Sequence, residues 1–82
     1  MYTVYAIYNK TVNKFYIGQT KNLSERLTIH NKKIFSGYTS KFDGNWEIIY
    51  SEKIKTRKEA LTREKQLKSY RGRQFIKKFI PG

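Results

Sequence analysis

Two tyrosines and a glycine near the start of the chain are the first residues whose types and spacing could support chemistry. Tyr16 and Gly18 lie in the run Lys14–Thr20, and Tyr5 lies in an earlier apolar run. If an even number of residues connects the two runs, a hairpin pairs residues whose numbers sum to an odd value, which places all three on one face. Two phenols beside a position without a side chain would leave room for a phosphate or a water. The alternative is that Gly18 marks a β-bulge or a strand end, with the tyrosines only packing on the sheet.

Arg26 and His30 form a second candidate pair. They are four residues apart and therefore share one face of a helix. A guanidinium can bind a phosphate through two parallel hydrogen bonds, and His30 is the single histidine of the chain. The alternative for His30 is a solvated or capping residue near a helix end. Because the chain has one histidine and no cysteine, metal sites built from these residue types are excluded.

Glu64 is the third candidate, because its helix directs it inward. The apolar residues Ala60, Leu61 and Leu67 define the expected buried stripe, and Glu64 lies three or four residues from each of them. A buried carboxylate is costly unless it is paired with a cation or coordinates a metal. Glu64 is therefore the best candidate for a metal ligand. The alternatives are an ion pair within its helix or with Arg26, or a position at the edge of the stripe.

Periodicity predicts the elements that must position these residues. Three runs rich in β-branched and aromatic residues predict strands over Tyr2–Asn9, Lys14–Thr20 and Trp46–Ile54. A first helix is expected over 22–34, with Asn22 as its N-cap and Leu23, Leu27 and Ile34 at helical spacing.

A second helix is expected from the capping box at 56–59, and turn chemistry at 43–45 falls in an irregular connector over 35–45. A break is expected at 71–73, followed by a short amphipathic helix that includes Phe75 and Ile76 and stops at Pro81. The pattern predicts one domain over 1–82 of the α/β (α+β) class. Its three-stranded antiparallel sheet is flanked by helices in the order ββαβα, followed by a short C-terminal helix.

The charge of the chain predicts a polyanionic partner. Eighteen Lys and Arg residues against six Asp and Glu residues give a net charge of +12. Folded, basic and aromatic-rich domains most often bind nucleic acid, because lysine and arginine release the counterions of phosphates. The alternatives are a basic surface kept for solubility, for anionic membranes or for an acidic protein.

Composition also limits where the protein acts. The absence of cysteine and of an N-terminal signal pattern favours a cytoplasmic protein, which we expect to be monomeric. No apolar stretch approaches the roughly 20 residues of a membrane span, so no membrane association is expected.

In order and in spacing, these residues resemble the GIY-YIG endonucleases, and the resemblance covers nearly the whole chain. The two tripeptides that name the family are represented by Thr3-Val4-Tyr5 and Tyr16-Ile17-Gly18. The arginine, histidine and metal-binding glutamate of the family match Arg26, His30 and Glu64. Two features depart from the family pattern. Thr3 replaces the first glycine, and no asparagine follows Asn45, whereas many members have one after the glutamate.

The resemblance implies hydrolysis of phosphodiester bonds in nucleic acid with one divalent ion, Mg²⁺ or Mn²⁺. The sequence does not decide between DNA and RNA, and we favour DNA as the substrate. Glu64 would hold the ion, Arg26 would neutralise the scissile phosphate, and Tyr5 would accept a proton from the attacking water while Tyr16 orients it. A phenol of pKa about 10 is ionised to about one part in a thousand at pH 7, so nearby positive charge must lower the pKa of Tyr5.

Other residues are expected to bind nucleic acid on grounds of charge and loop position. These are Lys32, Lys33, Tyr38, Lys41, Arg71 and Arg73. Each has a solvated surface position as its alternative. The competing hypothesis for the whole molecule is a basic nucleic-acid-binding domain without catalysis, which has no need for an inward glutamate beside two tyrosines and an arginine.

Overall fold

The computed structural model describes residues 1–32 and 39–81, so the predictions for Lys33, Ile34 and Tyr38 lie outside the described residues. The elements are, in order, β1 (Tyr2–Asn9), β2 (Lys14–Thr20), α1 (Leu23–Lys32), the short 3₁₀ helix η1 (Thr39–Lys41), β3 (Trp46–Ile54), α2 (Arg57–Lys68) and α3 (Tyr70–Lys77). None of the helices in these ranges is long and apolar enough to cross a membrane.

The strands form one antiparallel sheet in the order β2-β1-β3, so the predicted fold class is confirmed. Strand β1 is central and buried along most of its length, as its uninterrupted apolar sequence predicts. Strand β2 is an edge strand, and one side of its backbone is therefore not paired within the sheet.

The β1–β2 hairpin has the register that the sequence predicts. Its connector holds four residues, 10–13, and every pair in the ladder sums to an odd number; Tyr5 faces Gly18 and Ile7 faces Tyr16. Asn13 closes the connector with a φ of 54°, a left-handed conformation that asparagine adopts more readily than most residues. Tyr5, Tyr16 and Gly18 therefore share one face of the sheet.

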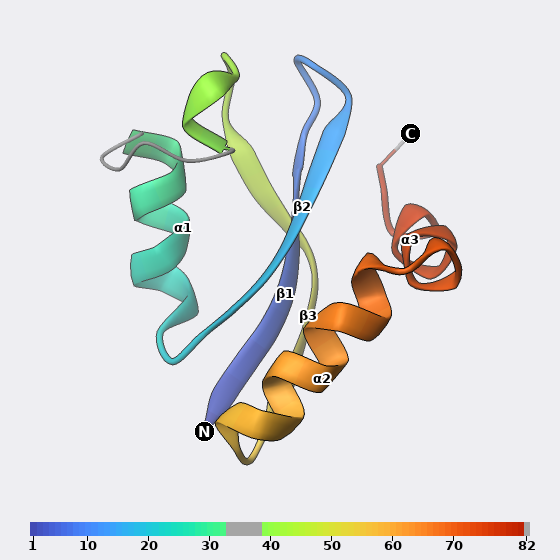
Figure 1. Cartoon of the computed structure of the whole chain (residues 1–82). Helices are drawn as coiled ribbons and strands as arrows, with labels where there is room; N and C mark the ends of the chain where they lie inside the picture. The colour runs from blue at the N-terminus through green and yellow to red at the C-terminus, as the bar shows by residue number, and fades with distance from the viewer. Residues whose placement is uncertain (33–38, 82) are drawn as a thin grey trace.

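Helices cover both faces of the sheet, as Figure 1 shows, with α1 on one side and α2 and α3 on the other. On the α1 face, Tyr5, Ile7 and Trp46 form a buried cluster against which Leu23 and Leu27 pack. On the opposite face, the buried residues are Val4, Ala6, Ile17, Ala60, Leu67 and Ile76. Because β1 contributes alternate side chains to both clusters, it holds the two layers together.

Local polar contacts fix α1 against the sheet. The side chain of Asn22 accepts a hydrogen bond from the backbone of Glu25 (3.1 Å), which confirms the predicted N-cap. At the other end of α1, the Asn31 amide accepts from the backbone nitrogen of Trp46 (2.6 Å) and donates to its carbonyl (3.1 Å). In the predicted turn between η1 and β3, Gly44 has a φ of +90°.

The corner between α2 and α3 corrects one prediction. Thr56 caps α2 as expected, accepting from the backbone of Glu59 (3.2 Å), but the chain breaks at Ser69 and not at 71–73. Ser69 both ends α2 and caps α3: its hydroxyl donates to the carbonyl of Gln66 (2.6 Å) and accepts from the backbone of Gly72 (3.3 Å). Gly72 is needed for close packing, since a Cβ there would lie 2.1 Å from the Gln66 carbonyl oxygen.

Candidate active site

Gly18 provides the space in which the Tyr5 phenol lies. It sits inside β2 in a regular pair with Tyr5, so it marks neither a bulge nor the strand end. A Cβ at Gly18 would lie 2.7 Å from the Tyr5 hydroxyl and 3.1 Å from Cε2 of Tyr16. The Tyr5 phenol therefore extends across β2 over a position that any side chain would obstruct.

His30 is a buried member of this cluster and not a solvated or capping residue. It is 7% exposed, and its Nε2 lies 2.9 Å from the Tyr5 hydroxyl. Its ring centroid is 5.3 Å from that of Tyr16. Helix α1 thus places an imidazole against both phenols of the hairpin.

Thr39 is a site residue that the sequence did not predict. Its hydroxyl lies 2.7 Å from Nδ1 of His30, so both nitrogens of the buried ring have partners. The Trp46 indole donates to the Thr39 carbonyl (3.3 Å), which fixes η1 beside the ring. The sequence offered only an indirect indication of Thr39. If His30 is buried and bonded to Tyr5 through one ring nitrogen, the other nitrogen needs a hydrogen-bond partner.

Arg26 lies on the same face of α1 as His30, as predicted. Its Nε is buried and has no hydrogen-bond partner among the residues that the structure describes. A buried guanidinium N–H without a partner is costly, and an incoming phosphate oxygen would satisfy it. Arg26 therefore has an unsatisfied buried donor on the α1 face that carries His30.

The electrostatics of the cluster correct the prediction for Tyr5. Burial, with a smaller effect from Tyr16, raises the pKa of Tyr5 to about 12, although hydrogen bonding and charge from Arg26 act to lower it. Burial and the Arg26 charge lower the pKa of His30. The charge of Arg26 therefore does not by itself lower the pKa of Tyr5, because desolvation outweighs it. At pH 7 both the phenol and the imidazole are neutral.

Glu64 approaches the tyrosines from α2, on the other side of the sheet. It lies between buried Ala60 and Leu67 with 20% of its side chain exposed. The prediction that Leu61 belongs to the buried stripe is wrong, because its side chain is 40% exposed. Its carboxylate accepts from Lys68 Nζ (2.7 Å), which is the ion pair within the helix named above as an alternative.

Lys68 shows how close Glu64 comes to the tyrosines. Its Nζ, bonded to Glu64, lies 5.8 Å from the centre of the Tyr16 ring. The charge of Glu64 also contributes to the raised pKa of Tyr5. Glu64 is therefore linked to Tyr16 through Lys68, and its charge acts on Tyr5.

Glu64 is the carboxylate at the β2 edge that could hold a hydrated divalent ion. Within 1–32 and 39–81, no group of three acidic, histidine or cysteine side chains could enclose a metal. Mg²⁺, however, retains several waters and is commonly held by one or two carboxylates together with substrate phosphates. Glu64 with a phosphate bound at Arg26 would make such a set. The site does not fit a permanently caged metal.

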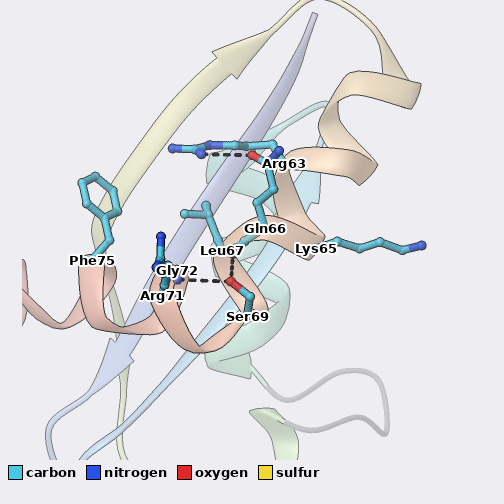
Figure 2. A pocket seen from close by; sticks show the side chains of 8 residues that line it. All are labelled: Arg63, Lys65, Gln66, Leu67, Ser69, Arg71, Gly72 and Phe75. Atoms are coloured by element: carbon cyan, nitrogen blue, oxygen red, sulfur yellow. Dashed lines mark hydrogen bonds between the residues drawn. The ribbon is translucent and has the colours of Figure 1, made fainter.

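The residues predicted to bind nucleic acid do not form one group. Lys32, at the end of α1, and Lys41, in η1, are exposed, whereas Lys33 and Tyr38 lie outside the described residues. Arg73 lines a cavity that includes Tyr16. Arg71 lines a different hollow at the α2–α3 corner, which we call the elbow groove and which Figure 2 shows with Arg63 and Lys65 around it.

A comparison with models of known protein families shows which family the chain belongs to. The family model described as the GIY-YIG catalytic domain matches residues 1–78. The chain belongs to the GIY-YIG family. No curated protein and no solved structure matches it.

GIY-YIG proteins are nucleases, whose substrates are nucleic acids and which generally use divalent metal ions. In this GIY-YIG domain, the two motif tyrosines, the α1 arginine and histidine, and the α2 glutamate meet around the β2 edge. Residues from four elements that are distant in sequence are thereby brought together.

Proposed function

We propose that this GIY-YIG domain is a metal-dependent endonuclease that hydrolyses phosphodiester bonds of DNA. The observation that supports it best is the Tyr5–His30 hydrogen bond, placed beside an unpaired Arg26 N–H and within the field of Glu64. A phosphate binder, a proton acceptor and a metal ligand are the parts that such a hydrolysis requires.

Arg26 binds the scissile phosphate. Its buried Nε gains a partner when a phosphate oxygen enters, so binding removes an existing cost. The guanidinium is always charged and its donors match two phosphate oxygens. Arg26 would thereby fix the phosphate near Tyr5 and stabilise the charge that develops on it.

Tyr5 and His30 move the proton together. With a pKa of about 12, only about one Tyr5 phenol in a hundred thousand is ionised at pH 7, so Tyr5 cannot wait as a phenolate. His30, neutral because its pKa is lowered, accepts the phenol proton on Nε2 while Tyr5 takes a proton from the attacking water.

Thr39 and Tyr16 position the reacting groups. For Nε2 to be an acceptor, Nδ1 must carry the hydrogen, which it donates to the Thr39 hydroxyl 2.7 Å away. The Thr39 hydroxyl can accept that hydrogen, so it is compatible with this tautomer of His30. Tyr16, whose ring packs against His30, would orient the water or the phosphate.

Glu64 would hold the divalent ion, with Lys68 leaving the carboxylate or sharing it. An ion bound there supplies positive charge to the phosphate and to the leaving oxygen. The alternative function, a nucleic-acid-binding domain without catalysis, is favoured by one observation: Glu64 already has a cationic partner.

Incubation with supercoiled plasmid tests the proposed function. We expect nicking with Mg²⁺ or Mn²⁺ and none with a chelator. Tyr5→Phe, which removes the hydroxyl bonded to His30, should abolish nicking. Tyr8→Phe is the matched control, since it removes another buried, hydrogen-bonded hydroxyl of β1 that bonds Asn13 instead. Equal nicking by Tyr5→Phe and wild type would contradict the role of Tyr5.

A further inference from the structure

A cavity of about 280 Å³ lies along the free edge of β2 and adjoins the candidate active site. It is lined by Phe15, Tyr16, Ile17, Lys68 and Arg73, and we call it the β2 cavity. Phe15 and Ile17 face the α2–α3 layer while Tyr16 faces α1, so a cavity lined by all three extends across the strand edge. Tyr16 and Lys68 connect it to His30 and Glu64.

Two cations are held at this cavity. The guanidinium of Arg73 lies 5.9 Å from the centre of the Phe15 ring, and Nζ of Lys68 lies 5.8 Å from that of Tyr16. Among the described residues that line the cavity, none is acidic. The surface beside Tyr16 is thus a concave patch of aromatic rings next to two cations, of which Lys68 is also paired with Glu64 (2.7 Å).

Arg73 is pre-positioned for a ligand. Its Nε donates to the backbone carbonyl of Lys68 (3.1 Å), at the last residue of α2. This bond and the Phe15 ring fix the guanidinium, so little side-chain entropy remains to be lost on binding. Within the described part of the chain, its two terminal amino groups make no hydrogen bond and can serve a phosphate.

We propose that the β2 cavity binds the phosphate next to the scissile phosphate on the substrate strand, with Arg73 as its main ligand and Lys68 as a second cation. This inference rests on the proposed function and adds the direction of the strand, which runs from Arg26 past Tyr16 along the β2 edge. We do not assign this phosphate to the elbow groove, because that groove shares no lining residue with the candidate site, whereas the β2 cavity shares Tyr16.

Arg71 offers a matched control for Arg73. The two arginines lie two residues apart in α3, both are exposed, and replacing either by alanine removes one positive charge. They differ in that Arg73 lines the β2 cavity and Arg71 lines the elbow groove (Figure 2). A comparison of the two variants therefore separates the cavity from the general basic charge of the surface.

The test uses a short single-stranded DNA hexanucleotide, without divalent ions so that no cleavage occurs. Backbone amide NMR shifts of the ¹⁵N-labelled full chain should change at Phe15, Tyr16 and Arg73 on titration. Arg73→Ala should bind about tenfold more weakly than wild type, and Arg71→Ala less than about threefold more weakly. Arg73→Lys, which keeps the charge without the planar fork, should fall between wild type and Arg73→Ala.

Several results would overturn the β2 cavity as the binding site. One is an equal loss of hexanucleotide affinity in Arg71→Ala and Arg73→Ala. Another is a set of amide shift changes confined to residues of the elbow groove. Melting curves establish that each variant is folded before its affinity is compared. If metal-dependent nicking persists while the cavity shows no shifts, this inference alone fails. If the cavity binds the hexanucleotide while no plasmid is cleaved, the proposed function fails, and the β2 cavity is a phosphate-binding site without a scissile neighbour.

Discussion

At the scale of single residues, the raised pKa of Tyr5 links the site to stability. The pKa of Tyr5 is about 12 in the folded chain and about 10 in the unfolded chain. The stabilisation is fully present below pH 10 and is lost as the pH rises from 10 to 12, because the unfolded chain releases the proton first. Tyr5 is 1% exposed, so its raised pKa converts to a loss of about 2–3 kcal/mol in the free energy of unfolding.

Denaturant unfolding of wild type and Tyr5→Phe between pH 8 and pH 12 measures this difference. The free energy of unfolding of wild type should decline more steeply above pH 10, because phenylalanine has no proton to release. The two proteins share every other residue, so the comparison isolates the Tyr5 hydroxyl. Parallel curves would show that Tyr5 is not desolvated in the folded state.

Gly18 is the second residue with a specific consequence. In Gly18→Ala the added Cβ meets the Tyr5 hydroxyl at 2.7 Å and Tyr5 Cζ at 3.0 Å, so the phenol must move away from His30. We expect at least about a tenfold loss of cleavage and about 1–3 kcal/mol of lost stability. Gln19→Ala, at the neighbouring half-buried position, should retain activity. Wild-type cleavage by Gly18→Ala would contradict this account.

At the scale of elements, the sequence predicted the strands and helix starts that depend on neighbouring residues. The bounds of all three strands follow from their β-branched and aromatic runs, and the start of α2 follows from Thr56. The break between α2 and α3 was predicted wrongly. Glycine suggested a loop at 71–73, whereas Gly72 is helical and is required by the carbonyl of Gln66 in another helix.

For the candidate site as well, the sequence predicted the features that depend on one element and missed those that depend on tertiary contacts. Glu64 was identified because it shares a helical stripe with Ala60 and Leu67, which is a property of one helix. Thr39 was not, because it lies nine residues from His30 in a segment without periodicity, and tertiary contacts alone join them. Nor could the raised pKa of Tyr5 be foreseen, since it depends on burial beneath α1.

The α2–α3 corner supplies the element-scale prediction. In Gly72→Ala the new Cβ would lie 2.1 Å from the Gln66 carbonyl oxygen and 2.4 Å from Cα of Leu67, and backbone atoms cannot rotate away. Helix α3 must therefore shift, at a cost of about 3 kcal/mol in the free energy of unfolding. Denaturant unfolding measures it, with exposed Gln74→Ala as the control on the same helix. Equal stabilities would show that the corner is loosely packed.

At the scale of the whole molecule, net charge determines how nucleic acid is bound. The charge of +12 is distributed over both helical layers and the sheet, so contacts to phosphates should dominate affinity and discriminate little between sequences. If about five phosphates are covered, log K should fall with log[salt] at a slope of about −4 to −5. Fluorescence anisotropy of labelled duplexes at several salt concentrations measures the slope. Salt-independent binding would contradict this account.

The central claim is that Glu64 serves a metal and not merely Lys68, and one comparison tests it directly. Glu64→Gln keeps the shape of the side chain and removes its charge, so plasmid nicking with Mg²⁺ or Mn²⁺ should be abolished while DNA affinity stays equal or rises slightly. Glu59→Gln removes the same charge from an exposed position of α2 and should nick as wild type does. A folded Glu64→Gln protein that nicks plasmid at the wild-type rate would contradict the assignment of the site.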